Sequence, residues 1–118
     1  MPDSIFPKNT FVTDHARGFI SVIGPDAHNF LQNIISNDLD KLDFITALHS
    51  CLLSPQGKFL HDFYVTKCTD GYLIDTEAAE RAADLHRRLG LYKLRANVTI
   101  TLEPPRTSYI WSNGTRHP

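Results

Sequence analysis

The chain has 118 residues, of which 42% are hydrophobic, and a formal net charge of -1. This length suits one domain with a real hydrophobic core and excludes two independent ones. The near-neutral charge excludes a global field that would draw the molecule to nucleic acid or to an anionic membrane. The sequence has no apolar run of the roughly 20 residues that span a bilayer, and Asp3 stands where a secretory signal carries basic residues. We therefore expect an intracellular protein.

The first elements are predicted from residues 10 to 42. Two short strands, 10–14 and 18–23, are expected to form a hairpin through a polar turn at residues 15–17. Gly24-Pro25-Asp26 then predicts a helix start, with Pro25 at the first helical position. The helix is expected to bury a stripe at three- and four-residue spacing: Ala27, Phe30, Leu31, Ile34 and Ile35. After a break at residues 36–38, a short turn or helical piece is expected to reach Leu42.

A three-stranded meander is predicted next. Residues 46–53 and 58–67 flank Ser54-Pro55-Gln56-Gly57, whose composition is typical of a hairpin turn. Asp70-Gly71 predicts a second turn before a strand at residues 72–75.

The second helix is expected to follow Thr76, a good N-cap residue, and to stop at Gly90. Beyond it, strands are predicted at residues 98–102 and near 108–111, separated by Pro104-Pro105. The result is an α+β domain whose mostly antiparallel sheet carries two main helices on one face. Because Trp111–Pro118 follow the last apolar strand without a closing element, we expect an exposed sheet edge there, plausible self-association, and a chain that is the N-terminal fragment of a longer multi-domain protein.

Motifs give little support for catalysis or metal binding. The six histidines lack the i,i+4 pairing of helical metal ligands, and neither a Ser-His-Asp arrangement nor a glycine-rich phosphate loop is suggested. Cys51 and Cys68 lie in strand-like runs without C-x-x-C spacing, so buried reduced thiols are expected. The sequence therefore predicts no catalytic and no metal-ligating residue.

Asp62 is the most informative single position. It lies inside the run FLHDFYV at residues 59–65, and alternation places it between Leu60 and Tyr64 on one sheet face. A carboxylate on such a face must be paired, hydrogen-bonded or used by a ligand. The alternatives are a solvent-facing edge carboxylate and a ligand-binding one. The second requires that the carboxylate lie near a concavity, away from bulk solvent.

Two histidines accompany Asp62. His61 is expected on the opposite face, so the pair forms no acid-base dyad. If the hairpin pairs around residues 54–57, His49 approaches Asp62 from the neighbouring strand, although a structural histidine is the simpler interpretation. A basic cluster, Arg81, Arg87, Arg88, Lys93 and Arg95, fits a glutamate tail or a phosphate backbone, and its members in the helix also fit the helix C-terminus.

Three stretches together resemble a known family: ISVIGPDAHNFLQNIISND at 20–38, LLSPQGKFLHDFY at 52–64 and LGLYKLRANVTI at 89–100. They are similar to the N-terminal part of the YgfZ-type folate-binding proteins, relatives of the glycine-cleavage T-protein, an aminomethyltransferase. The resemblance covers residues 10–112. It implies a tetrahydrofolate-binding domain in which Asp62 contacts the pterin, with His49, Tyr92 and Arg95 as further ligand-binding residues.

The resemblance also implies a role and partners. The YKLRANV stretch looks like the YgfZ branch, which implies maturation or repair of iron-sulfur enzymes, iron-sulfur client proteins as partners and, in bacteria, tRNA modification. The implied location is the cytoplasm of a bacterium or the mitochondrial matrix of a eukaryote. The alternative is a folate-dependent aminomethyl or one-carbon transferase. T-proteins usually have paired aspartates where this chain has His61-Asp62, which argues against that alternative.

Overall fold

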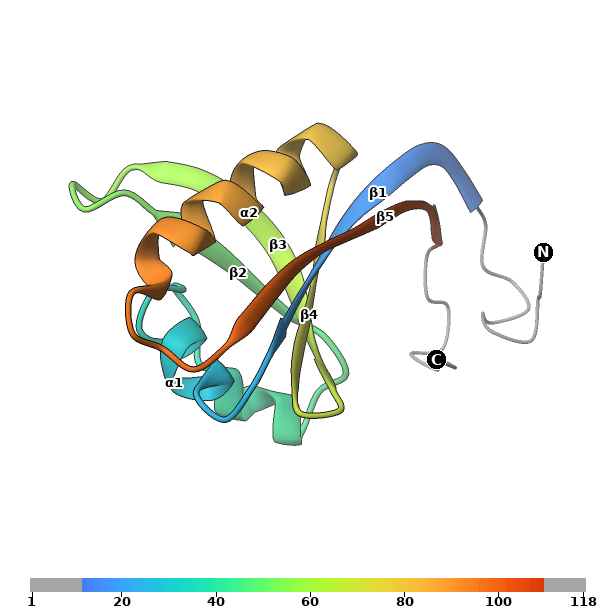
Figure 1. Cartoon of the computed structure of the whole chain (residues 1–118). Coiled ribbons are helices and arrows are strands. Elements are labelled where there is room, and N and C mark those ends of the chain that lie inside the picture. Colours follow the sequence, from blue (N-terminus) through green and yellow to red (C-terminus); the bar gives the residue numbers. More distant parts are fainter. Residues whose placement is uncertain (1–11, 110–118) are drawn as a thin grey trace.

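The computed structural model describes the backbone of residues 12–109 and the side chains of residues 17–104. A five-stranded antiparallel sheet, in the order β2-β3-β4-β1-β5, forms one layer of this region. The helices form the second layer on one face of the sheet, with α2 lying across it (Figure 1). The predicted α+β class, with two main helices on one face of an antiparallel sheet, is confirmed.

The elements follow one another without an internal repeat. They are β1 (Val12–Ile23), α1 (Ala27–Gln32), the 3-10 helix η2 (Leu39–Asp43), β2 (Leu48–Leu53), β3 (Phe59–Cys68), β4 (Gly71–Thr76), α2 (Ala79–Lys93) and β5 (Thr99–Tyr109). The core lies between the sheet and the helices because alternate strand residues and one stripe of each helix are apolar. Its fully buried members include Ile20, Leu31, Leu48, Leu52, Phe63, Val65, Ile74, Leu85 and Leu89.

The predicted meander of β2, β3 and β4 is confirmed. The turn between β2 and β3 is closed by Ser54, whose Oγ accepts the backbone N–H groups of Gln56 at 3.2 Å and Lys58 at 3.0 Å. Gly57 has a φ of 84°, which an L side chain rarely adopts. The local turn residues therefore fix the register that sets His49 opposite Tyr64.

The predicted hairpin at the N-terminus is wrong. Residues 12–23 form the single strand β1, which pairs with β5 at both of its ends. The pairing shifts register between Val12 and Ala16 and between Arg17 and Phe19. The segment His15-Ala16-Arg17 contains none of the glycine, proline or asparagine residues that turn a chain sharply. A distant partner strand therefore decides its conformation.

The predicted break at Pro104-Pro105 is also wrong, because β5 continues through both prolines. Arg17 pairs with Arg106 and Phe19 with Glu103, so the two prolines face the single residue Gly18. Such a bulge on an edge strand tolerates residues that cannot donate a backbone hydrogen bond. Of the predicted last strand, Trp111 lies outside the described residues.

Three predicted helix boundaries are corrected. Pro25 lies before α1, whose N-cap residue is Asp26, and the helix itself ends at Gln32. Ile34 and Ile35 still bond to the Leu31 carbonyl at 3.0 Å each. Thr76 does not cap α2, because Ala78 holds that position.

At its other end, α2 does not stop at Gly90 but runs on to Lys93. Gly90 is exposed and no atom lies within 4 Å of the position that a Cβ would take, so a glycine is tolerated there without ending the helix. The residue after the helix, Leu94, has a positive φ of 46°, but its ψ of -112° differs from that of the αL conformation typical of a terminating glycine.

Candidate functional site

The face of the sheet opposite α1 and α2 carries the sequence-predicted carboxylate. Three polar pairs cross this open face: His49 with Asp62, Arg17 with Asp75 at 2.6 Å, and Ser21 with Glu103 at 2.9 Å. Strand alternation brings them to one side because their neighbours in sequence point into the core. The open face is therefore chemically mixed, with ion pairs set among Leu60, Tyr64 and Leu73.

Asp62 is paired on this face. Its Oδ2 lies 3.2 Å from His49 Nε2, and its side chain is 44% exposed. Its backbone is held from the core side, where the buried Thr76 hydroxyl donates to the Asp62 carbonyl at 3.2 Å. The carboxylate is thus neither buried alone nor free in solvent, and the strand fixes its direction.

His49 is held by its surroundings in the same way. The Asn37 side-chain amide donates to the His49 carbonyl at 2.9 Å, and Ser36 bonds both backbone groups of Cys51 at 3.0 Å each. These contacts cover the outer edge of β2. The His49 ring packs edge-on against Tyr64, with ring centroids 5.1 Å apart. The expectation that His49 approaches Asp62 through the hairpin is confirmed.

His61 points to the other face, as its alternation predicts. It is only 5% exposed, and its Nε2 lies 2.7 Å from Asp84 Oδ2 on α2. The Nδ1 atom is buried without a hydrogen-bond partner. Asp84 also accepts hydrogen bonds from Arg87 and Arg88 at 2.8 Å each. The hydrogen bonds from Arg88, His61 and Arg87 hold the pKa of Asp84 well below its usual range.

Sequence reasoning missed Asp84, although its spacing to Arg87 and Arg88 is the i,i+3 and i,i+4 spacing of helical ion pairs. That spacing would have indicated that both arginines have a partner. Two members of the predicted basic cluster are therefore already paired within α2.

Tyr92 and Arg95 are not brought together with Asp62. They line a hollow of about 410 Å³ between α1 and the end of α2, on the helix side of the sheet. Asp62 and His49 lie on the opposite face. The four residues predicted to bind one ligand therefore form two separate pairs in this domain.

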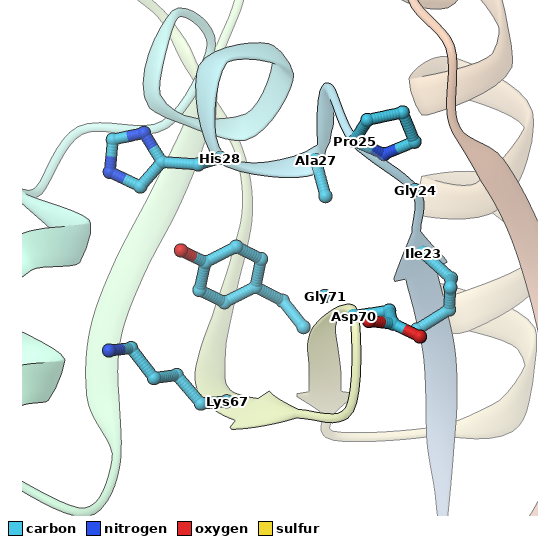
Figure 2. Close-up of a pocket in the computed structure, with 9 residues that line it drawn as sticks. Ile23, Gly24, Pro25, Ala27, His28, Lys67, Asp70 and Gly71 are labelled. Carbon is cyan, nitrogen blue, oxygen red and sulfur yellow. The ribbon is translucent and has the colours of Figure 1, made fainter.

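A second hollow, of about 590 Å³, lies where β1 meets α1 and β3 meets β4. Figure 2 shows His28 and Lys67 on opposite sides of it, with Ile23 and Asp70 at its other end. His28 is paired with Asp40 at 3.1 Å and Lys67 with Asp43 at 2.6 Å, and burial raises the pKa of Tyr72 beside them. Neither of these two hollows includes Asp62, whose side chain is 44% exposed, so neither supplies the concavity that a ligand-binding carboxylate requires.

Other features add no site within the part of the chain that the structure describes. No group of three or more histidine, cysteine or acidic side chains there is arranged to hold a metal ion. None of the described helices has the length and apolarity to cross a membrane. The prediction of buried thiols is wrong, because Cys68 is exposed and Cys51 half-buried at the sheet, although both are free.

The described fold is similar to that of a solved aminomethyltransferase. The glycine cleavage system aminomethyltransferase T from Bartonella henselae matches with a TM-score of 0.67 over 80% of this chain and 26% of that one, at 21% sequence identity. The domain therefore has an aminomethyltransferase T-like α+β fold. No protein-family model matches the chain.

By sequence, the chain is similar to iron-sulfur cluster assembly factor IBA57 homologues, named as mitochondrial. The identity is 34% over 108 residues for the Pyricularia oryzae protein and 34% over 97 residues for the Neurospora crassa protein. It is 28% over 115 residues for the Chaetomium globosum protein. These matches cover 86%, 76% and 81% of this chain and 26%, 22% and 26% of the respective relatives. The chain thus spans about a quarter of the length of each of these relatives.

Proposed function

We propose that this chain is a folate-binding domain of a YgfZ-like factor for the maturation or repair of iron-sulfur enzymes. The supporting observation is the His49–Asp62 pair, held in fixed positions on the open face of an aminomethyltransferase T-like sheet. The similarity to iron-sulfur cluster assembly factors supports the same cellular role. Iron-sulfur client proteins are the corresponding partners, and in a eukaryote the mitochondrial matrix is the corresponding location.

The chemistry of the pair fits a reduced pterin. When His49 donates to Asp62, the carboxylate keeps free lone pairs, which accept N–H groups of a flat heterocycle. The half-exposed Tyr64 ring beside His49 offers a surface on which such a ring can pack. The ligand would be a tetrahydrofolate, with Asp62 on the ring nitrogens and His49 orienting the carboxylate.

The open face offers only one wall of such a site. The chain spans about a quarter of the length of the relatives it matches. A folate held between this face and another part of a longer protein would make few contacts with the present domain, so its affinity here is weak. A role for Tyr92 and Arg95 in the same ligand stays a prediction that requires the ligand to extend past the sheet.

An aminomethyl or one-carbon transferase is the second candidate, favoured by the fold. Of the adjacent residues His61 and Asp62, only Asp62 presents a side chain to the open face, because His61 is buried against Asp84. A ligand on this face therefore meets a single carboxylate from this strand. This favours binding over group transfer. Contact with tRNA has less support, because Arg87 and Arg88 are paired with Asp84.

Folate binding is tested by titrating the 118-residue chain with 5-formyltetrahydrofolate and recording amide NMR shifts. Shifts are expected around His49, Asp62 and Tyr64. Because a hydrogen bond to a charged group is worth roughly 1.5–3 kcal/mol, Asp62→Asn should weaken binding by about tenfold or more.

The matched control is Asp70→Asn, which removes an exposed carboxylate from the turn before β4, where asparagine also tolerates a φ of 63°. It should leave the titration unchanged. Equal binding by wild type and Asp62→Asn, or shifts confined to the helix side, would remove the proposed site. An assay for aminomethyl release from a loaded carrier protein distinguishes the two candidate functions. Only the transferase requires turnover in this assay.

A further inference from the structure

Leu94, between α2 and β5, combines two unfavourable features. Its φ of 46° belongs to the left-handed region, where a residue with a Cβ is strained. Its side chain is also 86% exposed, and Leu91 one helical turn earlier is 66% exposed. Glycine would remove the strain, and a polar residue would remove the exposed apolar surface. Strained residues and exposed apolar side chains are both features that binding surfaces often have.

The two neighbours of Leu94 are unpaired cations. Lys93 and Arg95 make no ion pair within residues 17–104, whereas Arg17, Lys67, Arg87 and Arg88 all do. Asp26, the acidic residue that lines the same hollow, accepts the Asn97 backbone N–H at 2.7 Å. One of its oxygens is thus engaged in holding the corner together. Lys93 and Arg95 therefore have no direct ion-pair partner among the described residues, and the Asp26 carboxylate in the same hollow offsets part of their charge.

The hollow beside Leu94 is apolar inside and polar at its rim. Phe30 is buried, Ile34, Tyr92 and Ala96 pack against the core, and the exposed Asn29 and Asn33 border them. Figure 1 shows the end of α2 next to α1, where this hollow of about 410 Å³ lies. A shallow apolar floor with basic and amide groups around it can take an aliphatic side chain and the acidic residues that flank it.

The corner is held in shape before any partner binds. Asp26 N donates to the Asn97 carbonyl at 3.3 Å, Ala96 N to the Lys93 carbonyl at 2.8 Å, and Val98 N to the Ala96 carbonyl at 3.0 Å. Gly24 packs so close to the Asn97 backbone that a Cβ would collide with it. A preformed surface loses little conformational entropy on binding.

We propose that this corner, residues 92–96 with the adjoining hollow, docks an acidic segment of a partner protein that carries an aliphatic anchor. Lys93 and Arg95 attract the acidic residues, Leu94 packs against the partner's apolar side chain, and that side chain enters the hollow. Exposed Leu94 and Leu91 favour a protein over RNA, because phosphates gain nothing from contact with leucine. The proposal does not require the folate contacts of Asp62 and His49, since the corner lies on the helix side of the sheet, but it assigns Tyr92 and Arg95 to a protein partner in place of the folate.

The probe is a short synthetic peptide rich in glutamate that carries leucine anchors, titrated into the isotope-labelled chain by NMR. Its controls are the same peptide with serine for leucine, the same peptide with lysine for glutamate, a single-stranded RNA oligonucleotide, and inorganic phosphate. The first peptide alone should shift the amides of residues 29–34 and 91–97. No shift at millimolar peptide overturns the proposal, as do equal shifts with the serine peptide, RNA or phosphate.

Variants separate binding from folding. Leu94→Gly removes the anchor and relieves the left-handed strain, so peptide affinity should fall about tenfold while the melting temperature stays equal or rises. Lys93→Glu with Arg95→Glu should weaken binding at least as much, most strongly at low salt. The matched control is Lys41→Glu, an exposed lysine in η2, which should bind like wild type. Wild-type affinity in Leu94→Gly would overturn the proposal.

Discussion

His61 Nε2 on β3 lies 2.7 Å from Asp84 Oδ2 on α2, directly behind the strand position that presents Asp62 to the open face. His61 is buried, and Asp84 is half-buried with two arginines on its other lone pairs. The pair therefore joins the helix layer to the strand that carries the proposed ligand-binding carboxylate. His61, which is 5% exposed, is thus a direct contact between Asp84 and that strand.

Removal of the Asp84 side chain should destabilise the domain. In Asp84→Ala, His61 loses its partner at Nε2 while its Nδ1 already lacks one, and a buried polar group without a hydrogen bond costs roughly 1–3 kcal/mol. Urea unfolding followed by circular dichroism should show this loss. Arg87→Ala, which removes an exposed arginine and its surface ion pair with Asp84, should cost less than about 0.5 kcal/mol. Equal losses in the two variants would show that the His61 contact contributes little.

The same carboxylate should make stability depend on pH. The pKa of Asp84 is lower in the folded chain than its ordinary value of 3.8, so the carboxylate of the folded chain takes up its proton at a lower pH than that of the unfolded chain. Its contribution is complete above that ordinary value and is lost as the pH falls below it. Wild type should therefore lose more stability than Asp84→Asn between neutral and acidic pH, as measured by urea midpoints. Parallel curves for the two proteins would contradict this.

Local signals predicted the parts of the fold that local residues determine. The β2–β3–β4 meander follows from Ser54, Gly57 and the Asp70-Gly71 turn, and the approach of His49 to Asp62 follows from that register. Strand β1 was divided wrongly, and β5 was interrupted at its prolines, because their conformation depends on pairing across about 80 residues of sequence. No local pattern contains that information.

The candidate site was likewise predicted only where local residues determine it. Asp62 and His49 share a face because alternation is fixed by the strand, whereas Tyr92 and Arg95 were joined to them only through the resemblance. Their position depends on where α2 ends, and the sequence signal for that end, Gly90, was misinterpreted. A glycine ends a helix only when the apolar stripe stops too, and here Tyr92 continues it.

Gly90→Ala should stabilise the domain. Gly90 lies within α2, is exposed, and has open space where the new Cβ would go. Alanine loses less backbone entropy on folding, so a gain of roughly 0.5–1 kcal/mol is expected in a thermal or urea unfolding experiment. If Gly90 were the helix terminus instead, the alanine variant would be destabilised.

Alkylation of Cys68 should be slow near neutral pH. Although Cys68 is exposed as a residue, partial desolvation of its thiol, followed by the nearby charges of Asp70 and Glu103, raises the pKa of this thiol above its ordinary value, so less thiolate is present at a given pH. The iodoacetamide rate at Cys68, followed by mass spectrometry in Cys51→Ser, should keep rising at a pH where a free cysteine has reached its plateau. Asp70→Asn should move the profile toward lower pH. A plateau at the free-cysteine position would contradict the expected shift.

Gly71→Ala should destabilise the domain more than Gly57→Ala, although only Gly57 has a left-handed φ. At Gly57 the new Cβ meets open space, so the cost is the conformational one of roughly 1–2 kcal/mol. At Gly71 the Cβ would collide with the Val22 carbonyl oxygen, because β4 and β1 approach closely where Gly71 pairs with Ile23. Backbone atoms cannot rotate away as a side chain does, so the β1–β4 ladder must shift. Urea unfolding of both variants measures the difference, and a smaller loss in Gly71→Ala would show that this ladder yields easily.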